Sequence, residues 1–351
     1  MIKVCVIPCG PCYMNSTLMH GLLHFQKQGK LEVDFLFDIP WMYDGVEINE
    51  EELPKCKPHK THFTLYYDLD KKDYKKPDSE LIYKKLYDKY YDCVFTGEIN
   101  QDNDVMHPHV NYNKLVEIHN IYKEKFVIVD GSDGVTIDQY IPILEKDFPS
   151  AFVFKRDLIH MQNWRRLAPT SYGYPDMYVN DNKLKKEKTV SSILPAFYDT
   201  YVLGDREEYF REYKVSNFAF TWRKCGFDCA RHTQIIFNRC IPFMPDLIQD
   251  SGMPLMPLHH YPLNLIKKAM FQCFEIDATK WVNYKETVHN EFWPYGKTGT
   301  RNNYLRLMID IGAFKIRSLQ YYDELEEEIY QYAKRNLTCS KVVENMLRIV
   351  I

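Results

Sequence analysis

The sequence predicts an α/β protein with two doubly wound domains, a cleft between them and a helical tail at the C-terminus. Three observations carry this prediction. Apolar β runs alternate with helical spacing through the first half, a second strand–helix series follows an irregular segment, and 351 residues are enough for two domains at about 150 residues each. Strands that interleave with helices favour parallel, Rossmann-like sheets.

The first half shows five apolar runs with strand character and helical periodicity between them. The strands are expected at 2–8, 31–40, 92–99, 125–134 and 150–158, and the helices at 16–28, 79–90, 111–123 and 137–147. Ligands bind at the carboxyl ends of the strands in such sheets. The segments that follow the strands therefore belong to one rim, and they are 9–16, 97–104, 130–134 and 155–157.

Residues 159–195 are irregular, with prolines and a charged run, and they predict a domain edge. Beyond them, a strand is expected at 215–222, a helix at 232–239 and a strand at 240–245, with further helices at 198–213, 263–273 and 301–313. A pair of helices is expected over 320–348. The predicted domains are residues 1–190, residues 191–315, and a tail of residues 316–351 that packs back on the first domain.

The bulk composition is ordinary for a globular protein, with 45% hydrophobic and 26% charged residues. A net charge of −3 implies no general attraction to nucleic acid or to anionic membranes, so neither is expected as a partner. No apolar run reaches the length of a membrane span, and the first residues resemble a strand rather than a signal peptide. We expect a cytoplasmic protein whose cysteines are mostly buried thiols.

Three short motifs have both a chemical and a structural interpretation. The CGPC motif at 9–12 suits a redox site, but Pro8 replaces the usual tryptophan, and a tight turn facing the cleft is the favoured interpretation. Cys225, Cys229, His232 and Cys240 match no common zinc spacing. The carboxylates of Asp102 and Asp104 have the D-x-D spacing that can share a divalent ion bridging a sugar diphosphate.

The segment 223–232 gathers positive charge between a predicted strand and a predicted helix. Arg223 and Lys224 follow the strand, Gly226 permits a turn, and Arg231 and His232 open the helix. A diphosphate requires fixed positive charge, backbone N–H groups and a favourable helix dipole. The alternative is a solvated basic helix start that pairs with nearby acids. Pro242, in the next strand, would stiffen the chain where it leaves toward the cleft.

The stretch KCGFDCARHTQIIFNRCIPFMPD at 224–246 resembles the C-terminal domain of GT-B glycosyltransferases, especially exostosin-like and related viral and bacterial enzymes. Residues 256–270 and 292–309 resemble later segments of the same proteins, and DGSDG at 130–134 with FVFKRDL at 152–158 resembles their acidic loop and F-K-R strand. Gln234 stands where that family usually has a glutamate that contacts the nucleotide ribose. Its amide can still hydrogen-bond a hydroxyl, but it is neutral.

The resemblance implies a GT-B glycosyltransferase that takes a nucleotide diphosphate sugar, most readily a UDP- or GDP-sugar, and a glycan or glycoconjugate acceptor. The donor is its substrate, and no cofactor or metal is expected. The expected donor-binding residues are Arg223, Lys224, Gly226, Arg231, His232, Gln234, Pro242 and Arg156. If the reaction inverts the anomeric centre, the acceptor hydroxyl needs a base, for which Asp133 and Asp130 are the candidates. Asp133 can reach the acceptor, while Asp130 would orient it or cap the next helix. A metal-dependent transferase using Asp102 and Asp104, and a non-catalytic binding protein, remain alternatives.

Overall fold

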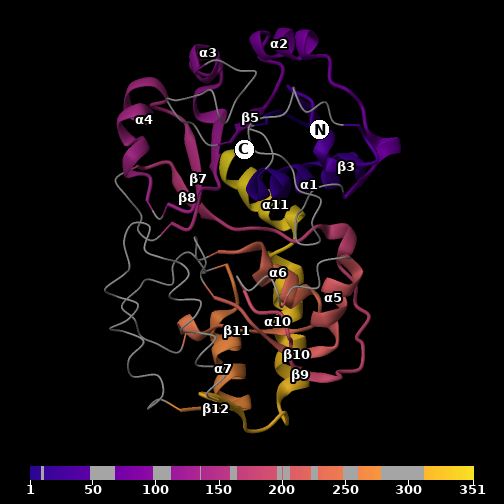
Figure 1. Ribbon diagram of the computed structural model, residues 1–351. Helices are drawn as coiled ribbons and strands as arrows, with labels where there is room; N and C mark the ends of the chain where they lie inside the picture. The colour runs from indigo at the N-terminus through magenta and orange to yellow at the C-terminus, as the bar shows by residue number, and fades with distance from the viewer. Residues whose placement is uncertain are drawn as a thin grey trace. The chain divides into compact units, whose positions relative to one another are not determined.

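The computed structural model describes residues 1–8, 12–47, 68–97, 112–134, 136–158, 164–195, 200, 206–222, 228–247, 260–277 and 312–351. The chain forms two compact units (Figure 1). Unit 1 contains Met1–Val179 and Asn336–Ile351, and unit 2 contains Asn180–Arg335. The expected mixed α/β class is confirmed, while the boundaries at residues 190 and 315 and the cleft stay predictions. None of the described helices is long and apolar enough to cross a membrane.

Unit 1 is built on a parallel sheet with the strand order β2-β1-β5-β6-β7-β8. The strands are β1 (Ile2–Ile7), β2 (Leu31–Phe35), β5 (Cys93–Thr96), β6 (Phe126–Asp130), β7 (Phe152–Arg156) and β8 (Leu167–Thr170). Two short strands, β3 (Tyr43–Asp44) and β4 (Leu69–Asp70), pair apart from it. Because all neighbouring strands run parallel, their carboxyl ends meet at one edge.

Both faces of this sheet are buried, which the continuous apolar runs require. One face packs against α2 (Ser79–Tyr87), α3 (Tyr112–Tyr122) and α4 (Ile141–Asp147). The alternating strand residues Val4, Phe95, Val127 and Phe154 point to the other face and are buried as well.

Helices α1 (Tyr13–Lys27) and α11 (Cys339–Val350) pack closely on each other in unit 1. The contact is so close at Gly21 that a Cβ atom there would lie 2.5 Å from the Val343 side chain and would also strike the Cys339 carbonyl. Glycine is therefore required at this crossing. The expected pair of tail helices is present, with α10 (Tyr322–Asn336) in unit 2 and α11 in unit 1.

Unit 2 is built on a smaller parallel sheet with the order β11-β10-β9. Its strands are β9 (Lys188–Val190), β10 (Ser216–Phe220) and β11 (Ile241–Phe243), and its helices are α5 (Arg206–Lys214), α6 (Ala230–Phe237), α7 (Leu263–Cys273) and α10. An antiparallel pair of strands, β12 (Phe274–Ile276) and β13 (Phe314–Ile316), adds phenylalanine rings that pack on Phe220 and Phe243. The helix expected at 301–313 falls almost entirely outside the described residues.

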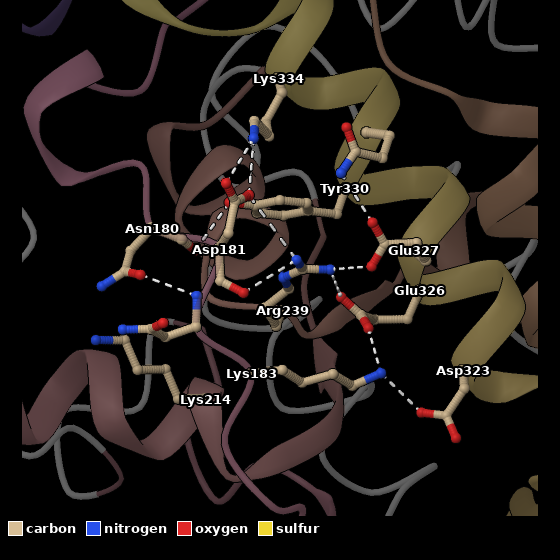
Figure 2. Close-up of polar contacts among 12 residues, drawn as sticks. Asn180, Asp181, Lys183, Lys214, Arg239, Asp323, Glu326, Glu327, Tyr330 and Lys334 are labelled. Carbon is tan, nitrogen blue, oxygen red and sulfur yellow. Dashed lines mark hydrogen bonds and ion pairs between the residues drawn. The ribbon is translucent and has the colours of Figure 1, made fainter.

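A network of charged side chains fixes α10 within unit 2 (Figure 2). Arg239, just before β11, pairs with Glu326 and Glu327 of α10, and its guanidinium lies 3.6 Å from the centre of the Tyr330 ring. Lys183 pairs with Glu326 at 2.7 Å. Ion pairs to Lys183 and Arg239 therefore hold α10 in unit 2, in addition to apolar packing.

Candidate functional site

The parallel unit β10–α6–β11 positions the segment that the sequence marks as a diphosphate site. Helix α6 starts at Ala230, two residues earlier than expected, so Arg231 lies in its first turn. No acidic side chain occurs in that turn, and Cys229 at the N-cap makes no side-chain capping bond. A helix start of this kind offers backbone N–H groups and a positive dipole end to an anion. The predicted ligands Arg223, Lys224 and Gly226 lie outside the described residues.

His232 does not supply the positive charge that the sequence suggests. It is 1% exposed, and burial, reinforced by the neighbouring Arg231 charge, lowers its pKa to about 3. The imidazole is therefore neutral near pH 7, and this part of the prediction is corrected. Among the described residues, neither ring nitrogen has a hydrogen-bond partner, and the same holds for the buried hydroxyl of Thr221 just beyond β10.

Gln234 and Pro242 are part of the packed interior of unit 2. The Gln234 Oε1 atom accepts a hydrogen bond from the Tyr209 hydroxyl at 3.1 Å, and the side chain is buried. Pro242 is buried in β11 opposite Ala219 of β10. Both positions support the strand and helix that carry Arg231, and their proposed contacts with a donor stay predictions.

The candidate catalytic carboxylates lie at the carboxyl edge of the sheet in unit 1. Asp130 ends β6 and is buried, and its Oδ1 accepts the Ser132 N–H at 2.8 Å. Its Oδ2 has no hydrogen-bond partner among the described residues. The Asp133 side chain is 52% exposed and pairs with Arg156. Asp133 is thus the carboxylate that a substrate can approach, whereas Asp130 holds the turn.

Arg156 is placed differently from a phosphate ligand. Its side chain is 2% exposed and donates to the Gly131 carbonyl at 2.9 Å, to Asp157 at 2.7 Å and to Asp133. The guanidinium also lies 4.8 Å from the centre of the Tyr172 ring. A role in binding the donor, which stays a prediction, would require some of these contacts to be given up.

The sequence places residues 155–157 on this edge, but it assigned no role to Lys155 or Asp157. Lys155 is fully buried, with its Nζ 3.4 Å from Asp130 Oδ1, and burial lowers its pKa. Asp157 is also fully buried and has a φ of 58°, which turns the chain sharply after β7. The signal available in the sequence was three consecutive charged residues at the end of an apolar strand.

The described residues contain no group of three or more His, Cys, Asp or Glu side chains placed to hold a metal ion. Asp102, Asp104 and Cys225 lie outside the described residues, as do three positions of the CGPC motif. Cys12, the last residue of that motif, caps α1 by accepting the Asn15 N–H at 3.3 Å. Neither the D-x-D alternative nor the redox alternative is decided by these contacts.

No family model matches the chain, and no curated protein matches it. Three solved structures are similar in fold. An alpha-glucosyltransferase in complex with UDP and a 13-mer DNA containing a central A:G mismatch is 11% identical, with a TM-score of 0.45 and all of both chains covered. An alpha-glucosyltransferase with UDP is 9% identical, with a TM-score of 0.45 and full coverage. A third, with UDP and a 13-mer DNA containing a HMU base, is 9% identical over 99% of each chain, with a TM-score of 0.44.

These identities and TM-scores establish neither a shared family nor a shared activity. One expectation is nevertheless corrected. The net charge of −3 was taken to exclude nucleic acid as a partner, and a protein similar to this chain has DNA bound. Binding to DNA depends on local clusters of positive charge and not on the net charge of a chain, so the exclusion was unsound.

Proposed function

We propose that the chain is a glycosyltransferase that moves a hexosyl or pentosyl group from a nucleoside diphosphate sugar, UDP- or GDP-linked, to a glycan or glycoconjugate hydroxyl without a metal ion. The observation that carries the proposal is the start of α6. It follows a parallel strand, has Arg231 in its first turn, contains no acidic residue there and lacks a side-chain cap. The sequence places Arg223, Lys224 and Gly226 in the connection that leads to it.

Each part of this arrangement has a physical role in binding a diphosphate. The helix dipole and the first-turn N–H groups favour an anion, and arginine adds fixed charge with a fork of donors. Neutral His232 and the Thr221 hydroxyl would contribute hydrogen bonds instead of charge, and both are buried without partners among the described residues. A bound donor would satisfy polar groups whose burial is otherwise unfavourable.

The transfer step assigns a role to Asp133. The acceptor hydroxyl oxygen forms a bond to the anomeric carbon while the bond from that carbon to the diphosphate oxygen breaks. The hydroxyl proton passes to the Asp133 carboxylate, and the diphosphate leaves with the bonding electron pair, its charge balanced by cationic side chains. Asp133 suits this role because its side chain is half exposed at the carboxyl edge of the sheet.

Calorimetric titration with UDP and GDP tests the donor site. Arg231→Ala should weaken the preferred nucleotide about 10- to 150-fold, because a hydrogen bond to a charged group contributes roughly 1.5–3 kcal/mol. Arg211→Ala is the matched control, since Arg211 is an exposed arginine on α5 of the same unit. Equal affinities in the wild type and Arg231→Ala would reject the diphosphate role.

A non-catalytic binding protein is the second candidate, favoured by Gln234, whose amide oxygen is engaged by Tyr209. A labelled UDP-sugar or GDP-sugar should be hydrolysed or transferred by an enzyme and returned unchanged by a binding protein. Glycan acceptors and duplex DNA belong in the same assay, because neither is excluded. Loss of transfer in EDTA that manganese restores would favour the metal-dependent alternative at Asp102 and Asp104.

A further inference from the structure

We propose that Lys155 and Arg156 are positioning residues that hold the loop at residues 131–134 from two sides and preset the carboxylate of Asp133. The proposal rests on the proposed function for what Asp133 does in the reaction. It also replaces the expected donor-binding role of Arg156 with one at the acceptor edge of unit 1.

The two residues are consecutive at the end of β7, so their side chains point to opposite faces of the sheet. Lys155 pairs in register with Asp130 of β6 and follows Val153 on the face that packs against α2, α3 and α4. Arg156 lies on the other face. The end of β7 therefore contacts the loop at residues 131–134 with side chains from both faces of the sheet.

Lys155 holds the middle of the loop. Its Nζ donates to the Ser132 carbonyl at 2.7 Å and contacts the Ser132 hydroxyl at 3.0 Å. Asp130 accepts the Ser132 N–H and lies 3.4 Å from the same Nζ, which closes a ring of three side chains and one backbone turn. Burying a charged group is unfavourable unless its hydrogen bonds are satisfied. Lys155 has no solvent exposure, so its contacts with Ser132 and Asp130 are needed to offset that cost.

Arg156 holds the two ends of the loop. It donates to the Gly131 carbonyl and to the Asp133 carboxylate, while Asp157 and the Tyr172 ring fix its guanidinium. A third contact closes the loop from α1, because a Cβ atom at Gly131 would lie 2.6 Å from the Met14 Cβ. The direction of the Asp133 side chain is thus set by groups that are themselves buried.

The charge at this edge also disfavours a diphosphate. Three carboxylates, of Asp130, Asp133 and Asp157, face two cations, Lys155 and Arg156, which leaves a net charge of −1 in this cluster. A neutral hydroxyl-bearing acceptor suits such a cluster better than an anionic donor does.

The test combines Lys155→Met, Arg156→Lys, Asp133→Asn and the double variant Arg156→Lys/Asp133→Asn. Arg156→Lys keeps the positive charge, so Asp157 still has a cation beside it. The substitution removes the forked set of guanidinium N–H donors. Arg166→Gln is the matched control, since Arg166 lies just before β8, at the other end of the same sheet. Amide hydrogen exchange of residues 131–134 measures the loop, turnover measures the reaction, and UDP or GDP titration measures the donor site.

We expect faster hydrogen exchange at the loop amides in Lys155→Met and Arg156→Lys, and an unchanged exchange rate in Arg166→Gln. Turnover should fall about 100-fold in Arg156→Lys, as for a misplaced catalytic group, with donor affinity unchanged. Arg156→Lys should add little in the Asp133→Asn background, because both changes act through one carboxylate.

Three results would overturn the proposal: unchanged loop exchange, a loss of donor affinity in Arg156→Lys, or full additivity of the two substitutions in turnover. Failure of the proposed function itself gives a different pattern. In that case the wild type neither binds a nucleotide sugar nor transfers its sugar. Hydrogen exchange of residues 131–134 then decides alone whether Lys155 and Arg156 hold the loop.

Discussion

Arg239 allows a specific stability prediction, because its backbone conformation destabilises the fold whereas its side-chain contacts stabilise it. Its φ is 59°, a left-handed conformation that costs a non-glycine residue roughly 1–2 kcal/mol. Its guanidinium is tied to Glu326, Glu327 and the Tyr330 ring (Figure 2). The side-chain contacts thus hold a strained backbone in place. Once the side chain is removed, the cost of the backbone conformation should appear as a difference in the free energy of unfolding between alanine and glycine at this position.

Arg239→Ala and Arg239→Gly lose the same side-chain contacts. The loss should cost about 3 kcal/mol, the lower end for breaking a buried pair, because Lys183 still pairs with Glu326 at 2.7 Å. Glycine then relieves the strain but loses about 0.4–1 kcal/mol through the greater entropy of its unfolded chain. Subtraction of the two ranges leaves Arg239→Gly more stable than Arg239→Ala by about 0–1.6 kcal/mol, with a midpoint of roughly 0.8 kcal/mol, the reverse of the usual order.

Urea unfolding, followed by hydrogen exchange in β10 and α10 for unit 2 and in β1 and β5 for unit 1, measures the stability of each unit separately. Lys89 is the matched control, since it is exposed, has a φ of 55° and makes no comparable ion-pair network with the described residues. Lys89→Gly should be as stable as the wild type or more so, and Lys89→Ala should not exceed it. An Arg239→Ala protein at least as stable as Arg239→Gly would refute the reasoning.

Three further predictions concern other parts of the molecule. Gly21→Ala should destabilise unit 1 by about 1–3 kcal/mol in urea unfolding, because the added methyl strikes Cys339 and Val343 of α11. His232, with its pKa lowered from 6.5 to about 3, binds a proton only when unfolded between these values, so unit 2 should lose about 2 kcal/mol from pH 7 to pH 5. That loss should be absent in His232→Gln, and its persistence there would contradict the assignment. Asp133→Asn should cut turnover roughly 100- to 10,000-fold at unchanged donor affinity, and near-normal turnover would remove Asp133 from the mechanism.

The sheet in unit 1 was predictable from local patterns, but its order was not. Apolar runs such as FVIVD at Phe126–Asp130, separated by helical periodicity, are sufficient to predict buried parallel strands. The placement of β1 between β2 and β5 depends on long-range packing that no local pattern encodes. The same applies to the tail. Its two helices follow from periodicity, whereas the packing of α11 on α1 depends on a glycine at residue 21, distant in sequence.

The candidate site shows the same division between local and long-range information. The start of α6 was found because a helix, a glycine turn and basic residues are adjacent in sequence. The charge of His232 was misjudged because burial, not residue type, sets its pKa. The contacts of Arg156 were not predictable from local sequence, because its partners, Gly131 and Asp133, lie 25 and 23 residues away along the chain.

The charges near the two sheets suggest why a transferase would divide its substrates between the units. The start of α6 carries Arg231 without an acidic residue in its first turn, and the sequence adds Arg223 and Lys224 before it. Among the described residues, the cluster of Asp130, Asp133, Asp157, Lys155 and Arg156 in unit 1 carries one more carboxylate than cations, and both of its cations are buried and paired within it. In the proposed function, an anionic donor would favour the start of α6, whereas a neutral hydroxyl would approach Asp133 without opposing charge. We therefore assign Lys155 and Arg156, within the proposed function, to the acceptor edge and not to a second phosphate site, although their charge alone would suggest the opposite.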